Sequence, residues 1–289
     1  MTVALLLAAA LTTAPPMEVR LKDGATCTIA ADHSLSTERD GKTSGWSLKT
    51  EKRLTWRKSG LARSAQVTVT PLSATPGPGS PPEVAKGRSF PVEAAVEVDA
   101  SLMPTGFVDG KAVRGVFANV AGRDITGMER LADPAAMAMI AAEMAVVGRA
   151  QAFPLVPGKP YVQQTTLPGP MAGFELNAVT TYLMETYDEA AGRAVVTWRQ
   201  QVDPASFSKS VASLLAYVAK ATPDELEKTK SALADMVMTR DETCRYDLDL
   251  STGLAAKADC ESIVTINSSK SRGRTTERWA IAQTLPEAR

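Results

Sequence analysis

The stretch CRYDLDLSTGLAAKADC, from Cys244 to Cys260, predicts an antiparallel β-hairpin that turns at STG. With the turn centred on Thr252, one set of facing pairs is made of apolar residues and cysteines: Cys244 with Cys260, Tyr246 with Ala258, Leu248 with Ala256, and Leu250 with Leu254. The alternate pairs bring opposite charges together, Arg245 with Asp259 and Asp247 with Lys257. Because successive side chains of a strand point to opposite faces, the hairpin should have one dry face and one solvated face.

The two cysteines of this hairpin are expected to form a disulfide bond. Cysteines that face each other across two strands meet the distance requirement, and closing a loop of this length stabilises a fold by about 3 kcal/mol. A zinc site needs four ligands, and the sequence has only Cys27 and His33 to add. A redox CxxC pair is absent. The alternative is a pair of free buried thiols, and in either case Cys27 is expected to be free.

A disulfide requires an oxidising compartment, and the N-terminus carries features of an export signal. Residues 1–16, MTVALLLAAALTTAPP, contain an apolar run followed by small residues that suit cleavage near Ala10. The usual early Lys or Arg is missing, because the first basic residue is Arg20. The run is too short to span a bilayer. We expect a signal peptide at 1–16 and a periplasmic or secreted protein; a buried first segment of a cytoplasmic protein is the alternative.

Composition excludes several partner classes. Lys plus Arg and Asp plus Glu both number 32, so the formal net charge is 0 and no basic field indicates nucleic acid. No glycine-rich phosphate loop is present, and we expect no cofactor. The length of 289 residues allows one large domain or two modest ones.

The chain shows a weak internal echo that divides it at about residue 152. LKDG at 21–24 resembles LVPG at 155–158, and each is followed by strand-like segments with alternating apolar residues. Coincidence is the alternative to a true repeat. A Pro/Gly-rich segment at 71–82, PLSATPGPGSPP, is expected to form a loop and neither strand nor helix.

Helices are predicted between the groups of strands. The Met-rich segment at 133–151 opens with Asp133 as N-cap and Pro134 in the first turn. The segment 203–239 opens in the same way at Asp203 and reads as a helix pair. The sequence therefore predicts an α+β fold of mainly antiparallel, curved sheets, which allows two half-barrel-like repeats, covered by the Met-rich helix and the helix pair. The two β-rich halves are 17–152 and 153–289, the second with the hairpin at 241–266.

The opening FPLVPGKPY at 153–161 and the turn strand DLSTGLA at 249–255 carry a resemblance. Together with the half-chain plan they resemble a family of uncharacterised bacterial envelope proteins, secreted or lipid-anchored, that are built from an internal duplication. The resemblance covers about residues 90 to 285. This chain departs from it in lacking the anchoring cysteine. The resemblance implies no enzymatic activity.

Catalytic patterns are weak or incomplete. SFSK at 206–209 matches a serine-lysine signature, but the later Lys-Thr-Gly strand that this machinery needs is missing. His33, in the polar segment AADHSLSTERDGK, is expected on a solvated loop. Asp247 and Asp249 are expected to belong to surface charge pairs and not to a cation site. We therefore expect no catalytic and no metal-binding residues.

Two features point to binding. The first is the set of apolar helix stripes, where the Met-rich helix is pliable enough to line an adaptable site. The residues that can line a ligand are Met137, Ile140, Met144, Phe207, Val211 and Leu214. The second is the basic segment 38–63, where Lys49, Arg53 and Arg57 can form an anion-facing surface. Ordinary core packing and a solvated strand face are the respective alternatives. The sequence thus favours a non-catalytic protein that binds an apolar or amphipathic ligand or an envelope protein; an envelope-acting hydrolase is the competing class.

Overall fold

The computed structural model describes residues 19–59, 62–78, 92–100, 102–110, 129–151, 155–168, 175–207, 209–210, 237–268 and 272–286. The predicted signal peptide at 1–16 lies outside these residues. Val211, Leu214 and most of the predicted helix pair lie outside them as well.

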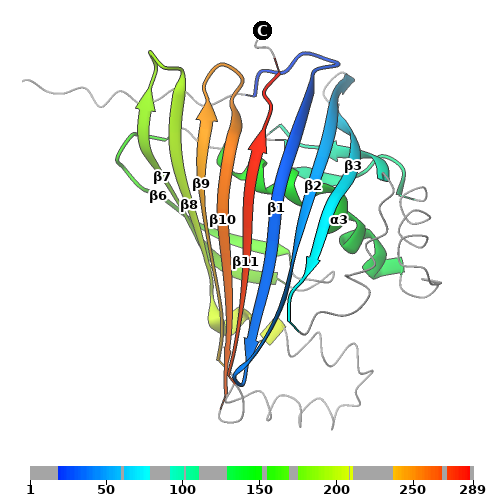
Figure 1. Ribbon diagram of the computed structural model, residues 1–289. Coiled ribbons are helices and arrows are strands. Elements are labelled where there is room, and N and C mark those ends of the chain that lie inside the picture. The colour runs from blue at the N-terminus through cyan, green and yellow to red at the C-terminus, as the bar shows by residue number, and fades with distance from the viewer. Residues whose placement is uncertain are drawn as a thin grey trace, which may run out of the picture.

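The described chain forms one antiparallel sheet of eleven strands in the order β5-β4-β3-β2-β1-β11-β10-β9-β8-β7-β6 (Figure 1). The predicted class, α+β with a mainly antiparallel curved sheet, is confirmed, and the sheet is not closed. The strands are β1 (Thr26–Arg39), β2 (Lys42–Ser59), β3 (Ala62–Pro76), β4 (Val92–Val98), β5 (Pro104–Phe107), β6 (Tyr161–Pro168), β7 (Glu175–Asp188), β8 (Arg193–Val202), β9 (Val237–Asp249), β10 (Leu254–Asn267) and β11 (Arg272–Gln283).

The strand order is a simple meander when it is read from β6 through β11 and β1 to β5. Its first and last strands in sequence, β1 and β11, pair in the middle of the sheet, from Ile29 opposite Gln283 to Arg39 opposite Gly273. The chain must therefore pass from one edge of the sheet to the other between β5 and β6. Helix α3 (Glu129–Gly148) and the short 3₁₀ helix η1 (Arg149–Gln151) belong to this crossing.

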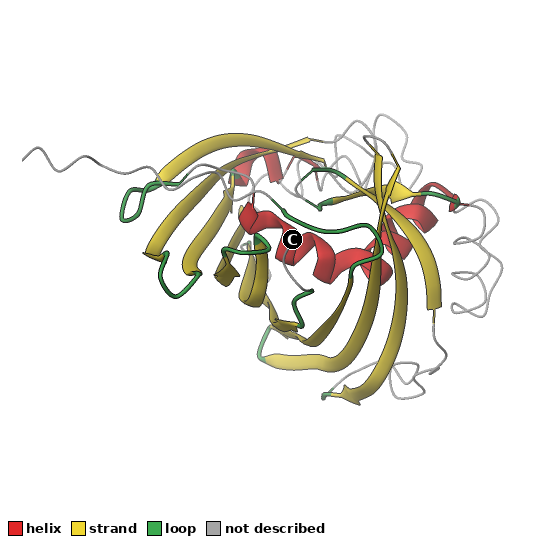
Figure 2. Ribbon diagram, turned by 90° about the horizontal axis from the view of Figure 1, so that it is seen from above, coloured by secondary structure: helices red, strands yellow, loops and turns green. Residues whose placement is uncertain are grey.

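Helix α3 lies across the concave side of the sheet, which curves around it (Figure 2). A helix of 20 residues spans about 30 Å. Ile140, Met144 and Val147 are buried in the main core cluster, which also takes residues from both halves of the chain. The two halves thus share one sheet and one core. The helix begins at Glu129, before the predicted N-cap Asp133, so Pro134 lies beyond the first turn and one backbone hydrogen bond cannot form there.

The hairpin of β9 and β10 confirms the predicted register as far as Lys257. Cys244 pairs with Cys260, Tyr246 with Ala258, and Asp247 with Lys257. A bulge between Ala255 and Lys257 then shifts the register, so that Leu248 faces Ala255. The predicted pairs nearest the turn are wrong for this reason, because the bulge places one extra residue on β10.

The prediction of a loop over 71–82 is wrong for its first part, since β3 continues through Pro76. The register of β2 and β3 shifts between Lys49 and Thr50, where Pro71 enters the strand, and Leu72 is left exposed. Among the described residues, β3 pairs with β4 no further than Val69. Proline, which lacks a backbone N–H, is tolerated in a strand at such a bulge and at such an edge.

The two turns of the sequence echo are alike in structure. Gly24 and Gly158 both adopt a positive φ, of 77° and 75°. The N–H of Gly24 donates to the carbonyl of Trp56 at 2.8 Å, and the N–H of Gly158 donates to that of Met184, also at 2.8 Å. The two turns therefore have the same local geometry, while an internal duplication remains a prediction.

Candidate functional site: the polar row of the concave face

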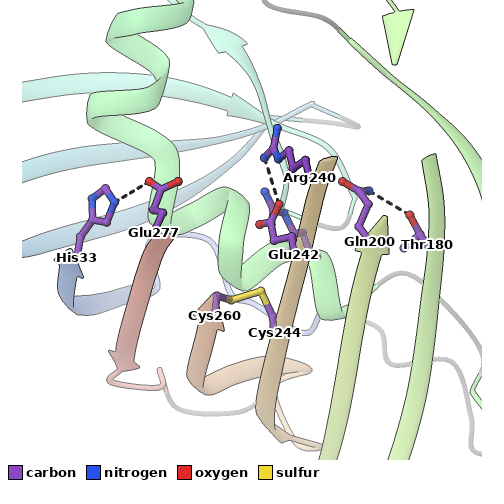
Figure 3. Close-up of polar contacts among 9 residues, drawn as sticks. His33, Thr180, Gln200, Arg240, Glu242, Cys244, Cys260 and Glu277 are labelled. Carbon is purple, nitrogen blue, oxygen red and sulfur yellow. Dashed lines mark hydrogen bonds and ion pairs between the residues drawn. A yellow bond between two sulfur atoms is a disulfide. The ribbon is translucent and has the colours of Figure 1, made fainter. Parts of the chain in front are cut away.

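The concave face carries a row of polar residues that crosses six neighbouring strands. Strand pairing places these residues side by side from β11 to β6: Glu277, Ser262, Glu242, Gln200, Thr180 and Gln163. We call this set the polar row. Four of its members, Ser262, Glu242, Gln200 and Thr180, are buried. Figure 3 shows its central part together with the disulfide.

A second row lies directly beside the polar row, on the side of α3. It contains four aromatic residues, one histidine and the disulfide, in register from β1 to β6: His33, Trp279, Cys260, Cys244, Trp198, Tyr182 and Tyr161. We call this set the aromatic row. The Cys244–Cys260 disulfide is formed, with the Cα atoms 4.0 Å apart, and Cys27 is free and buried. Both cysteine predictions are confirmed.

His33 is the point at which the two rows are joined on β1. Its Nε2 lies 2.6 Å from Glu277 Oε1, its ring stacks on Trp279 with centroids 3.3 Å apart, and Trp46 meets it edge-on at 4.7 Å. The prediction of a solvated loop histidine is therefore wrong, because His33 lies within β1 and points to the concave face. This half of β1 has polar residues on both faces. The sequence therefore lacks the alternation of apolar and polar residues by which a strand is predicted.

Glu242 is the charged centre of the polar row. Its carboxylate accepts hydrogen bonds from Arg149 of η1 and, at 3.2 Å, from Nη2 of Arg240 on the same strand. The guanidinium of Arg149 also lies over the ring of Trp198, 4.8 Å from its centroid. Two guanidinium groups thus meet one carboxylate, which leaves one positive charge in excess at this point.

The far end of the polar row is a chain of neutral hydrogen bonds. Gln200 Nε2 donates to Thr180 Oγ1 at 3.0 Å, and the hydroxyls of Thr180 and Thr165 are 3.1 Å apart. A small apolar cluster follows on the next row, formed by Leu176, Ala178 and Val202, with Leu167 and Phe207 packed against it. The polar row therefore separates this cluster from the main core.

The residues predicted to line a ligand site are distributed over both apolar regions. Ile140 and Met144 are buried in the main core, and Met137 packs against it half-buried. Phe207 belongs to the smaller cluster on the other side of the polar row. That these side chains contact a ligand remains a prediction.

The predicted anion-facing residues lie on the opposite, convex face. Lys49, Arg53 and Arg57 are exposed and alternate along β2 with the inward residues Thr50, Lys52 and Leu54. Lys49 Nζ is 3.2 Å from a carboxylate oxygen of Asp32 on β1. The three residues share a face, as the spacing predicts, and at least one is already paired.

Ser206 and the hairpin carboxylates have local structural contacts. Asp203 caps the helical turn that begins at Pro204: Oδ2 accepts the N–H of Ser206 at 2.8 Å. The hydroxyl of Ser206 donates to the carbonyl of Asp203 at 3.0 Å and accepts the N–H of Asn177 at 3.1 Å. Asp249 Oδ1 accepts hydrogen bonds from the turn residues Ser251 and Thr252. Among the residues that the structure describes, no group of three His, Cys, Asp or Glu residues is arranged to hold a metal ion.

Sequence reasoning missed the polar row. Each strand contributes one residue to it, so its members are spread from residue 163 to 277 and form no motif. Only the register of six strands brings them together. One signal was available in the sequence: β8 and β9 each carry a polar residue, Gln200 and Glu242, at a position where the alternation predicts an inward apolar one.

Comparisons with known proteins establish no family. No family model matches the chain, and no curated protein matches it. Among solved structures, a DUF1329 family protein from Desulfovibrio piger is 8% identical over 91% of this chain and 88% of that one, with a TM-score of 0.16. OccK11 (OpdR) from Pseudomonas aeruginosa is 6% identical over 95% of this chain and 100% of that one, with a TM-score of 0.18. Within the described residues, no helix has the length and apolar character needed to cross a membrane. The two structures are distant neighbours, and their TM-scores are too low to carry an argument about function.

Proposed function

We propose that this protein is a non-catalytic, exported binding protein that holds an amphipathic small molecule on the concave face of its sheet. The polar row carries the proposal. Buried polar groups destabilise a fold relative to apolar packing unless they are fully paired. The row of six polar residues between two apolar regions suits a ligand that is itself part polar and part apolar.

The polar end of the ligand is placed at Glu242. Its two arginine partners give this point an excess positive charge, so an anionic or strongly hydrogen-bonding head group is favoured there. Arg240 is the better contact, because its side chain is 35% exposed and remains accessible.

The apolar part of the ligand is placed along the inward residues next to the row. Ile266 on β10 is 37% exposed, and Leu35 and Val264 are half-buried. Met137 supplies a pliable side chain on one side of the row and Phe207 an apolar ring on the other. Val211 and Leu214, which the sequence predicts on the same stripe as Phe207, are proposed as further contacts. Ligand sites of this kind are mainly apolar and carry few polar groups.

The disulfide supports an oxidising location. We propose that residues 1–16 direct export and that the protein acts in the periplasm or outside the cell. The loose resemblance to uncharacterised envelope proteins is consistent with this location.

Native mass spectrometry of protein recovered intact from the periplasm of its own organism tests the proposal. We expect a bound molecule in the wild-type protein that is lost in Arg240→Gln. The matched control is Arg245→Gln, which removes a charge from the outward face of the same strand. A wild-type protein that carries nothing, or equal loss in the two variants, would contradict the proposal.

A further inference from the structure

A cavity of about 230 Å³ lies at the rim of the sheet, where the segment before β1 passes the ends of β2 and β3. Five basic residues line it: Arg20, Lys22, Arg57, Lys58 and Arg63. Asp23 is the one acidic residue among its described lining residues. We infer that this cavity, which we call the rim pocket, binds a compact phosphate-type anion.

The charges of the rim pocket are not neutralised within the part of the chain that the structure describes. None of the five basic residues forms an ion pair there, although ion pairs are formed elsewhere on the sheet. The carboxylate of Asp23 instead accepts the backbone N–H of Lys58 at 2.9 Å. Like charges gathered around one cavity repel one another, and an anion between them removes that repulsion.

The hollow on the convex face provides a contrast. It has a volume of about 600 Å³, and its basic residues are already paired. Lys49 lies 3.2 Å from Asp32, and Arg278 lies 2.7 Å from Glu261. A bound anion would have to displace these carboxylates, which is not required at the rim pocket.

Hydrogen bonds to backbone carbonyls hold the walls of the rim pocket in place. The N–H of Arg20 donates to the carbonyl of Thr252 at 2.9 Å, and the N–H of Gly24 donates to that of Trp56 at 2.8 Å. Arg63 Nη1 donates to the carbonyl of Ala100 at 3.1 Å. The backbone of the walls is therefore held in place without a ligand, which lowers the entropy cost of binding.

Two further details bear on the ligand. A Cβ added to Gly24 would lie 3.6 Å from Nη1 of Arg57, so this guanidinium reaches back over the segment before β1. The planar guanidinium is suited to pairing with two oxygens of a phosphate. The volume is below the roughly 300 Å³ at which sites for drug-sized ligands begin, so it suits a small head group.

The phosphate-type anion can be free or can be the head group of a lipid, and the test separates the two. Calorimetric titration with inorganic phosphate at low ionic strength measures the first. Co-sedimentation with vesicles of phosphatidylglycerol, compared with phosphatidylcholine, measures the second. The site variant is Arg20→Gln/Arg57→Gln, in which both altered side chains are exposed. The matched control is Lys49→Gln/Arg53→Gln, which removes the same charge from the convex face.

We expect phosphate or phosphatidylglycerol to bind the wild-type protein. The affinity should be at least tenfold lower for the site variant and unchanged for the control. Binding should also weaken as salt is raised. Absence of binding to both probes, or equal weakening in both variants, overturns the inference. Thermal melting of each variant checks that the fold is retained. Arg240→Gln should leave phosphate binding unchanged, so the outcome is independent of the function proposed for the concave face.

Discussion

Lys52 of β2 and Glu143 of α3 form an ion pair in the interior, where their side chains are 1% and 4% exposed. Lys52 Nζ also donates to the carbonyl of Ile140 at 2.9 Å, and Thr50 Oγ1 donates to Glu143 Oε1 at 3.0 Å. These contacts link the helix to the concave face at one fixed position. Burial acts to lower the pKa of Lys52, and the charge of Glu143 opposes this effect only in part.

Removing one partner of this pair should destabilise the protein strongly, because the other charge stays buried. We expect Lys52→Met or Glu143→Leu alone to lower the free energy of unfolding by about 3–5 kcal/mol. The double variant should lose much less, since two apolar side chains pack where two charges were. Urea denaturation of the four proteins measures the coupling. Additive losses in the double variant would show that the two residues do not act as a pair.

The buried hydroxyl of Tyr246 should make the protein less stable in alkali. Its hydroxyl donates to the carbonyl of Val146 at 2.9 Å, near the end of α3, and burial raises the pKa of Tyr246 well above its usual value. Above about pH 10 the unfolded chain releases this proton while the folded chain keeps it. The folded state then binds more protons, so stability falls as pH rises. Tyr246→Phe should cost about 1 kcal/mol at neutral pH and should flatten this decline. If the stability of both proteins falls equally with rising pH, groups other than Tyr246 cause the decline.

The three cysteines should differ in their reactivity with alkylating agents. In non-reducing peptide mapping, Cys244 and Cys260 should appear as one linked pair, and Cys27 should react with alkylating agents only after unfolding. Burial raises the pKa of the Cys27 thiol and blocks access to it. Cys244→Ala/Cys260→Ala should lower stability by about 3 kcal/mol in the chain-entropy view. Alkylation of both hairpin cysteines in native protein would refute the linkage.

The turn between β9 and β10 predicts a loss of stability in acid. Burial acts to raise the pKa of Asp249, but hydrogen bonds from Ser251 and Thr252 outweigh it and lower the pKa. A lowered pKa in the folded state gives stability that is present above the unfolded value of about 3.9 and is lost as pH falls through the folded one. Asp249→Asn keeps an oxygen acceptor and should remove this dependence. Thermal unfolding between pH 2 and pH 6 compares the two proteins.

The sequence predicts local features of this fold well and its longest-range features poorly. The Cys244–Cys260 register follows from alternation over a single hairpin, so it needs no information from the rest of the chain. His33 and Glu277 are 244 residues apart, and their contact depends on the pairing of β1 with β11. The inward position of Lys52 was hidden because a lysine on a strand reads as solvated. Its partner, Glu143, lies on a different element.

The pairing of β1 with β11 has a consequence for how the chain folds. The strand that begins near residue 26 cannot complete its hydrogen bonds until the strand that ends near residue 283 has been made. Contacts between such distant segments slow folding, because the entropy cost of closing the long loop comes before the stabilisation from the contacts. During synthesis, β1 therefore keeps one open edge until the last strand arrives.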